Sequence, residues 1–216
     1  DDFKEVLPQL DRVTMELHHT VMQIRMEPVG VMFNRFPRMI RDLSRKQEKD
    51  INFVMEGEET ELDRSIIDEL GDPMTHLLRN AVDHGIETPA ERINNNKPEQ
   101  GNLTLRAYQV GSEIIIEVED DGAGINKEKL VKKAVSKWVV NSEEIENMND
   151  SEKLNLIFHP GLSTSDEVSN VSGRGVGMDV VKKTIENLDG EIHIQSEKNK
   201  GNKFTISLPL TLAIIE

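Results

Sequence analysis

The chain has 216 residues, enough for one well-packed core and a small second unit. It has no cysteine, which excludes disulfides and thiolate metal sites, and no apolar run reaches the roughly 18 residues of a membrane-spanning helix, so direct membrane insertion is not expected. The net charge is −14 and the acidic excess lies after Lys49, which argues against a nucleic-acid-binding surface because such a surface carries a basic stripe.

The first part of the chain predicts a long helix over residues 4–27. Its apolar side chains recur at intervals of three and four, close to a heptad seam, and Pro8 is tolerable in a first turn. One seam cannot bury itself, so it needs a partner helix from a missing N-terminal part or from a second subunit. The chain begins without Met inside this pattern, and we therefore expect a fragment of a longer protein. The seam consists of Val6, Leu10, Val13, Leu17, Val21 and Ile24.

A second helical pattern follows the interruption at residues 28–30. Its apolar face runs from Met32 to Leu43, and Pro37 is expected to bend it by removing the hydrogen bond to the Phe33 carbonyl. The opposite face is basic and is most simply a solvated face. It carries Arg35, Arg38, Arg41 and Arg45.

The middle of the chain predicts a strand, a capped helix and an irregular polar insert. These are residues 51–56, residues 64–70 after the N-cap Asp63, and residues 88–101. The tripeptide Gly71-Asp72-Pro73 is expected to end the capped helix and to start another one that stops at Gly85.

The remaining elements are a central hairpin, two helices, a third helix capped by Gly190, and a last hairpin. They cover residues 103–108 with 113–119, residues 127–138, residues 151–158, a helix ending near Leu188, and residues 191–196 with 203–208. Strands clustered with long helices in this order predict an α+β fold, an α/β sandwich in which a mixed sheet carries its helices on one face.

The helix before Gly85 carries a polar stripe. His76, Asn80, Asp83 and His84 fall at i, i+4, i+7 and i+8 and share one face. Asparagine forms helices poorly, so its presence asks for a reason. A wet surface is the simpler interpretation. The functional interpretation is that these side chains face a Mg²⁺-bound triphosphate, because the neutral amide oxygen of Asn80 is a hard ligand that suits Mg²⁺.

The segment after the second strand of the central hairpin places Asp120 and Asp121 before Gly122 and Gly124. An aspartate followed by glycines at a strand end is often only a turn. A carboxylate there can also accept a hydrogen bond from the exocyclic amine of adenine, while the glycines let the base lie against the backbone.

Two later segments are candidates for phosphate contacts. Residues 158–164 combine an aromatic side chain, a turn and hydroxyls, which is typical of a mobile lid. Residues 171–179 contain three alternating glycines that run into a helix, which indicates a phosphate cradle. The Rossmann pattern fails because Met178 stands where its last glycine is needed, and the chain has no P-loop pattern, so any nucleotide site must be of another kind.

The order of these motifs is more specific than any one of them. Together they closely resemble the ATP-binding domain of the gyrase, Hsp90, histidine-kinase and MutL superfamily. Within it, residues 76–87 and 172–181 are similar to the motifs of the chemotaxis histidine kinase family CheA. Residues 24–29, 33–38 and 208–212 extend the resemblance over nearly the whole chain.

The resemblance implies a Bergerat-type sheet with an ATP lid, and roles for single residues. Asn80 would hold Mg²⁺, Asp120 would read the adenine amine, and His76 could assist phosphoryl transfer beside Asn80. The residues that it assigns to ATP are His76, Asn80, Asp83, His84, Asp120, Gly122, Gly124, Ile125, Ser163, Thr164, Gly173, Arg174, Gly175, Val176, Gly177 and Met178.

The resemblance also implies an organisation for the longer protein. Residues 1–48 would be a partial helical dimerisation segment with its linker, residues 49–212 the ATP-binding kinase domain, and residues 213–216 the start of a linker to a missing domain. The implied partners are a phosphotransfer domain that carries the acceptor histidine, a second subunit, a coupling protein, chemoreceptors and a response regulator. The location would be cytoplasmic, at receptor arrays through partners.

The interpretation is therefore an ATP-dependent protein-histidine kinase core, with two alternatives left open. One is an ATPase of the same superfamily in which hydrolysis closes a clamp. The other is a non-catalytic dimerisation scaffold whose nucleotide site only sets conformation. No acceptor motif surrounds His18 or His19, which we interpret as surface residues.

The last motif departs from the family pattern. The family commonly has Gly-Thr before the phenylalanine of the final strand, whereas Asn202 follows Gly201 here. Asparagine can still donate and accept hydrogen bonds.

Overall fold

A five-stranded mixed sheet forms the centre of the computed structural model, which describes residues 2–162 and 177–210, without the side chains of residues 2–5, 18, 19, 22 and 23. The strand order is β2-β4-β5-β7-β6; β2 and β4 are parallel and all other neighbours are antiparallel. The strands are β2 (Ile51–Glu56), β4 (Gly101–Val110), β5 (Glu113–Asp120), β6 (Glu191–Glu197) and β7 (Gly201–Pro209). The predicted strands and both hairpins are confirmed.

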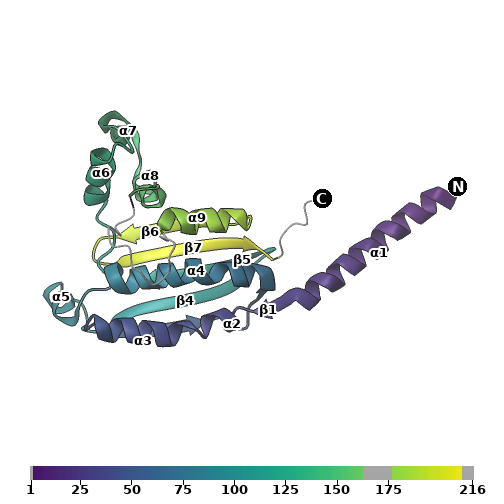
Figure 1. Ribbon diagram of the computed structural model, residues 1–216, viewed down its shortest axis with the longest axis horizontal. Coiled ribbons are helices and arrows are strands. Elements are labelled where there is room, and N and C mark those ends of the chain that lie inside the picture. Colours follow the sequence, from purple (N-terminus) through teal and green to yellow (C-terminus); the bar gives the residue numbers. More distant parts are fainter. Residues whose placement is uncertain (1, 163–176, 211–216) are drawn as a thin grey trace.

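Three helices pack against one face of this sheet: α3 (Phe36–Lys46), α4 (Arg64–Asn80) and α9 (Met178–Asn187) (Figure 1). Their apolar side chains and the inward side chains of the strands form one core, in which Leu70, Leu77, Leu105 and Ile116 have no exposed surface. Burying each such side chain contributes roughly 1.5–3 kcal/mol. The predicted α+β class with its helical layer is confirmed.

The other face of the sheet is covered by charged side chains. Arg106 on β4 donates to Glu56 at 2.7 Å and to Glu117 at 2.9 Å, and Lys203 on β7 approaches Glu117 at 2.7 Å. Burial raises the pKa of Glu117, but the hydrogen bonds from Lys203 and Arg106 outweigh it, so that the pKa is lowered overall. Because these charged side chains pair with one another, we expect a ligand site on the helical side of the sheet or at its ends.

Helix α1 (Asp2–Arg25) extends away from the body (Figure 1). Its predicted seam is exposed, with Leu10 at 60% and Leu17 at 64%. After α1 the chain forms a small ribbon in which β1 (Met26–Pro28) pairs with β3 (Glu61–Asp63). Within the described part of the chain, no helix is both long and apolar enough to cross a membrane.

The expected bend at Pro37 is wrong, because two separate helices stand there. Helix α2 (Gly30–Phe33) ends before α3 begins at Phe36. Pro37 lies in the first turn of α3, where a backbone N–H has no helical acceptor to lose. The proline therefore starts a helix rather than bending one.

The expected break at Gly71-Asp72-Pro73 is also wrong, because α4 continues through it. Pro73 removes one backbone hydrogen bond but is itself buried in the core. The apolar side chains before and after it face the same core, so burial of one continuous stripe outweighs that loss. This stripe consists of Ile66, Ile67, Leu70, Met74, Leu77 and Leu78.

The insert at residues 88–101 was expected to be irregular, but it contains α5 (Pro89–Asn94). Thr88 and Glu91 form a capping box, and Pro89 occupies the first turn. The signal was present in the sequence as Thr-Pro-x-Glu. It was missed because a helix of six residues is too short to show a periodic apolar face.

A helical cluster lies at one end of the sheet, where Leu154 and Phe158 join it to the main core (Figure 1). It comprises α6 (Lys127–Ser136), α7 (Ser142–Asn147), α8 (Asp150–Asn155) and the 3₁₀ turn η2 (Leu156–Phe158). The helices expected at 127–138 and 151–158 are present within one to three residues, and α7 was not predicted. Ala134, Leu156 and Leu162 form a small core of their own.

The cap after α9 differs from the expectation. The left-handed residue is Asp189, with φ of 56°, and Gly190 donates its N–H to the Ile185 carbonyl at 3.0 Å. Glycine is required at 190 because a Cβ there would lie 2.6 Å from the Ser207 carbonyl oxygen. The glycine therefore serves the contact with β7 and not the turn.

Trp138, the only tryptophan of the chain, follows α6 with φ of 59° and with 94% of its surface exposed. A bulky side chain in this left-handed region costs roughly 1–2 kcal/mol, and the exposed ring gains little from packing. We expect Trp138→Gly to raise the free energy of unfolding by about 1 kcal/mol, measured by urea denaturation with circular dichroism.

Trp138→Ala is the matched control for this prediction. It removes the same ring but keeps a Cβ in the left-handed region, so it should not stabilise the protein. An equal gain in both variants would attribute the effect to the exposed ring and would contradict the backbone explanation.

Candidate functional site

The C-terminal end of α4 forms the first wall of the candidate site. His76 and Asn80 lie on α4, while Asp83 and His84 lie on the π-helical turn η1 (Ala81–Gly85). The Ile86 N–H donates to the Ala81 carbonyl at 2.8 Å, a widened turn of the kind often found at functional sites. Such a turn was not predictable from a 3.6-residue period.

The start of α9 faces this end of α4. The Asn80 side-chain nitrogen lies 3.4 Å from the Met178 sulfur, so residues that are 98 positions apart in the chain meet here. Gly177 is the N-cap of α9 and makes no side-chain cap bond, and within the described residues the N–H groups of Met178 and Asp179 have no acceptor. The fold thus brings two of the predicted motifs together.

His76 is half-buried between these elements. Burial lowers its pKa first and the neighbouring Arg79 lowers it further, while Asp179 and Asp83 act in the opposite direction. The imidazole is therefore neutral at neutral pH. It can hold one proton on one ring nitrogen and accept a hydrogen bond at the other.

Asp83 is engaged with the segment after α3. Gln47 donates to its carboxylate, and Lys49 donates to the Val82 carbonyl and to the Asp83 carbonyl, the latter at 3.2 Å. Burial lowers the pKa of Lys49, and Asp83 opposes this shift. These contacts fix η1 against α3. His84, next to Asp83, is exposed.

Asp120 forms the second wall, at the end of β5. It is 5% exposed, and burial raises its pKa from 3.8 to about 6. The Gly122 N–H donates to its Oδ1 at 2.9 Å, and the Asn202 amide nitrogen donates to its Oδ2 at 3.2 Å. A buried carboxylate with a perturbed pKa at a strand end is a candidate ligand-binding group.

Two glycines allow the turn after Asp120 to pass between η1 and β6. A Cβ at Gly122 would lie 2.0 Å from the Gly85 carbonyl oxygen, which instead accepts from the Ala123 N–H at 2.9 Å. Gly124 has φ of 71°, and a Cβ there would lie 2.3 Å from the Glu197 carbonyl oxygen. Both glycines are therefore fixed by close backbone approach, in addition to any ligand that they meet.

The chain's family follows from comparison with known proteins. Residues 69–212 match the family described as histidine kinase-, DNA gyrase B-, and HSP90-like ATPase. The chain belongs to this family. Two solved structures share the fold: a blue-light activated histidine kinase from Erythrobacter litoralis (16% identity, TM-score 0.50, 86% of this chain and 64% of that one) and the Acinetobacter baumannii histidine kinase AdeS (16%, 0.50, 97% and 84%).

The predicted resemblance to CheA is confirmed. The chain is 47% identical to chemotaxis protein CheA of Bacillus subtilis and 51% identical to sensor histidine kinase CheAY of Helicobacter pylori, with 100% of this chain aligned in both cases. It covers 32% and 27% of these proteins, so it spans about a third of the curated relatives that it matches.

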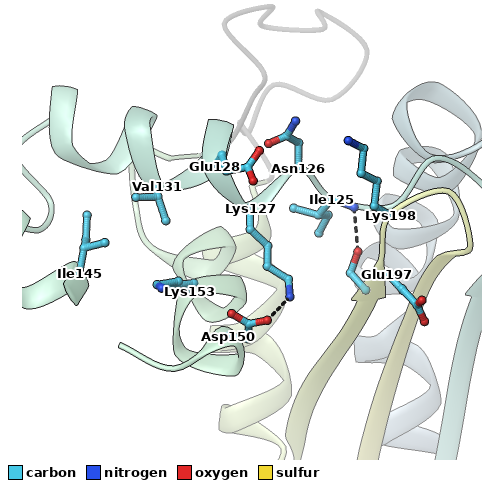
Figure 2. A pocket seen from close by; sticks show the side chains of 11 residues that line it. Ile125, Asn126, Lys127, Glu128, Val131, Ile145, Asp150, Lys153, Glu197 and Lys198 are labelled. Carbon is cyan, nitrogen blue, oxygen red and sulfur yellow. Dashed lines mark hydrogen bonds and ion pairs between the residues drawn. The ribbon is translucent and has the colours of Figure 1, made fainter. Parts of the chain in front are cut away.

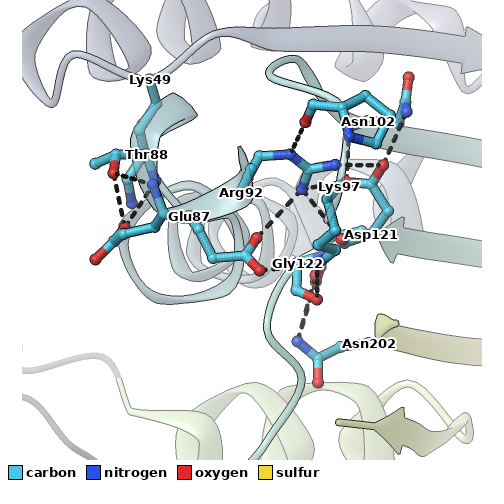
Figure 3. Close-up of polar contacts among 12 residues, drawn as sticks. Lys49, Glu87, Thr88, Arg92, Lys97, Asn102, Asp121, Gly122 and Asn202 are labelled. Carbon is cyan, nitrogen blue, oxygen red and sulfur yellow. Dashed lines mark hydrogen bonds and ion pairs between the residues drawn. The ribbon is translucent and has the colours of Figure 1, made fainter. Parts of the chain in front are cut away.

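A buried ionic network supports the turn after Asp120, and the sequence did not indicate it (Figure 3). Arg92 on α5 is 1% exposed and binds both carboxylate oxygens of Asp121, at 3.0 and 3.1 Å. It also contacts Glu87 at 3.2 Å, and Lys97 bridges Glu87 and the Gly122 carbonyl at 2.8 and 2.7 Å. The only available signal was that Arg92 and Lys97 are basic residues within an acidic chain.

The remaining predicted ATP contacts divide into two groups. Ile125 directly follows the turn and donates its N–H to the Ser196 hydroxyl at 2.7 Å. The other group lies outside the described residues and comprises Ser163, Thr164, Gly173, Arg174, Gly175 and Val176. The side chains of His18 and His19, predicted to be surface residues, also lie outside the described part of the chain. No residue of this second group contributes to the geometry above.

A cavity of about 470 Å³ lies behind Ile125, between the α6–α8 cluster and the turn that joins β6 and β7 (Figure 2). Lys127 and Asp150 face each other there at 2.6 Å, and Lys153, Lys198 and Glu197 also line it. Because basic and acidic side chains are mixed, the lining selects no ligand of one charge.

The metal-binding capacity of the described residues is limited. They contain no cluster of three or more histidine, aspartate and glutamate side chains that could hold an ion. Asn80 still fits a magnesium ion that is mainly bound by phosphate, since its amide oxygen makes no hydrogen bond within the described residues and Mg²⁺ needs few protein ligands beside phosphate and water.

Arg92→Met tests the ionic network. The change leaves the carboxylates of Asp121 and Glu87 without their guanidinium, so we expect a loss of about 3 kcal/mol in the free energy of unfolding, measured by urea denaturation. Arg106→Met is the control, because that side chain is 31% exposed, its partners Glu56 and Glu119 are about half exposed, and the buried Glu117 keeps its ion pair with Lys203. Equal losses would show that burial of the network does not matter.

Asp120→Asn tests the raised pKa of Asp120. Between pH 3.8 and about 6 the folded protein binds more protons at this site than the unfolded chain does, so ionisation lowers the free energy of unfolding as pH rises. Asparagine does not titrate. From pH 4 to pH 7 the stability difference should therefore move by about 2 kcal/mol in favour of the variant.

Asp150→Asn gives the opposite sign and serves as the control. The hydrogen bond from Lys127 lowers the pKa of Asp150, so the wild type gains stability as pH rises and the difference moves against the variant. Chemical denaturation at several pH values measures both series. A pH-independent difference for Asp120→Asn would contradict the assignment.

Proposed function

We propose that this chain is the ATP-binding catalytic core of a chemotaxis protein-histidine kinase. It binds Mg-ATP and transfers the γ-phosphoryl group to a histidine on a separate phosphotransfer domain, in trans between subunits. The observation that carries the proposal is the meeting of Asn80, the start of α9 and the buried Asp120 around one site in a member of a histidine kinase-like ATPase family.

Asp120 would bind the adenine base. Its ionised carboxylate accepts a hydrogen bond from the exocyclic amine, and the turn with Gly122 and Gly124 lies against the base, followed by Ile125. The raised pKa supports this role because a carboxylate that is buried without a salt bridge gains most from a ligand that donates to it.

The triphosphate would extend from the base toward α9. The open N–H groups after Gly177 favour an anion, and residues 173–177 would continue this cradle, with Ser163 and Thr164 on the lid. The Asn80 oxygen would be a ligand of Mg²⁺, which neutralises phosphate charge when it is bound. Asp83 and His84 would lie at the edge of this region.

His76 would help to orient the reacting phosphoryl group. A neutral imidazole can accept or hold a proton at this point, which agrees with the lowered pKa. Transfer of a phosphoryl group depends mainly on positioning and on charge stabilisation, so the residues that fix the triphosphate outweigh any single base.

The domain organisation stays part of the proposal. Residues 1–48 would be a dimerisation segment with its linker, residues 49–212 the kinase domain and residues 213–216 a linker. The exposed seam of α1 supports pairing with a second subunit. The phosphotransfer domain, a coupling protein, chemoreceptors and a response regulator would be the other partners, with the protein in the cytoplasm.

Asn80→Ala tests the function directly. The chain is incubated with Mg²⁺, ATP labelled at the γ-phosphate and a phosphotransfer domain that carries an acceptor histidine. We expect the wild type to label the acceptor and Asn80→Ala to reduce the rate at least a hundredfold, because the triphosphate loses its fixed position. Asn187→Ala, an exposed asparagine at the end of α9, is the control.

Each outcome of this experiment has one meaning. Release of phosphate without labelling of the acceptor would indicate a clamp-type ATPase. Binding of ATP without turnover would indicate a nucleotide-sensing scaffold. Full transfer by Asn80→Ala would refute the role of Asn80.

A further inference from the structure

Asn202 stands opposite Asp120 on the neighbouring strand, at the position where the motif departs from the usual Gly-Thr. Asp120 on β5 and Asn202 on β7 are register partners, and both turn toward the helical side of the sheet. The simpler interpretation is that Asn202 only replaces the usual threonine and has no role in the site. Its hydrogen bonds indicate more.

The orientation of the Asn202 amide follows from its neighbours. The Ile125 N–H donates to the Ser196 hydroxyl oxygen at 2.7 Å (Figure 2), so the hydroxyl hydrogen is free to donate elsewhere. It donates to Asn202 Oδ1, also at 2.7 Å. The amide nitrogen must then face the other way, and it donates to Asp120 Oδ2 at 3.2 Å.

We propose that Asn202 is a positioning residue for Asp120: by holding an N–H on the carboxylate it fixes the carboxylate's orientation and favours the charged form that accepts the adenine amine. The inference rests on the proposed function of Asp120. It also explains the link to Ser196 and Ile125, because the turn that flanks the base and the carboxylate that reads the base are joined by one chain of hydrogen bonds.

Few groups around Asp120 can stabilise its ionised carboxylate. Asp121 opposes ionisation by charge repulsion, and the backbone of Gly85 is the nearest part of η1. Within the described chain no basic side chain forms an ion pair with Asp120. The donors that stabilise its charge are therefore the Gly122 N–H, the backbone N–H of Asn202 and the side-chain amide of Asn202, and only the last depends on which side chain stands at position 202.

Asn202→Asp turns this arrangement into a pH-dependent one. Near neutral pH two carboxylates would face each other and repel, whereas below about pH 6 they can share a proton that restores a donor to Asp120. ADP affinity, measured by calorimetry from pH 5 to 8.5, should fall at least tenfold between pH 6 and pH 8 in the variant. In the wild type it should rise up to about pH 6 and then stay level.

Two further variants isolate the role of the donor. Gln195→Glu makes the same amide-to-carboxylate change on the exposed side of β6, next to Ser196, and should leave the wild-type profile. Asn202→Thr keeps a side-chain donor and should also lack the alkaline decline. A decline with Asn202→Thr, or an equal loss of affinity by Asn202→Asp at every pH, would overturn the proposal.

Folding is monitored at each pH by circular dichroism. If Asn202→Asp unfolds above pH 7, the proposal is tested with Ser196→Ala instead, because loss of the hydroxyl frees the Asn202 amide to rotate. A roughly tenfold loss of ADP affinity in Ser196→Ala supports the proposal, and an unchanged affinity overturns it. If the wild type itself binds no ADP at any pH, the proposed nucleotide function fails. If instead the wild type binds ADP and the variants show no pH effect, only the proposed role of Asn202 fails.

Discussion

The contact between the end of η1 and the turn after β5 is the constraint on which the rest of the site depends. The Gly85 carbonyl accepts from the Ala123 N–H at 2.9 Å, and this approach is possible only because Gly122 lacks a side chain. The contact places the buried Asp120 beside the helix that carries Asn80. The shared core packs α4 against the sheet, and this contact fixes how the end of η1 meets the end of β5.

The ionic network of Arg92 stabilises this contact by holding the residues of the turn, Asp121 and Gly122. Its guanidinium binds Asp121 and Glu87, and Lys97 ties Glu87 to the Gly122 carbonyl. All these groups have partners, which is the condition under which buried charges are tolerated. Asp121 is paired with Arg92, whereas Asp120 has no ion pair within the described residues, so burial raises the pKa of Asp120 without an opposite charge to offset it.

Local rules of sequence reading failed where short elements or tertiary packing decide. Pro73 lies inside α4 because a continuous apolar stripe is buried on both sides of it. The six-residue helix α5 showed its capping box but no apolar period. Such elements are stabilised by contacts with distant residues, which no local pattern contains.

The sequence by itself determined the strands, the long helices, the mixed sheet and the order of the nucleotide motifs, because periodicity, glycines and polar spacing are local properties. Tertiary structure alone decided that Met178 meets Asn80, that Arg92 holds Asp121, and that Asn202 turns its N–H to Asp120. These pairs are separated by 98, 29 and 82 positions. Their contacts, and the pKa shift of Asp120, arise only when strand register and burial bring distant groups together.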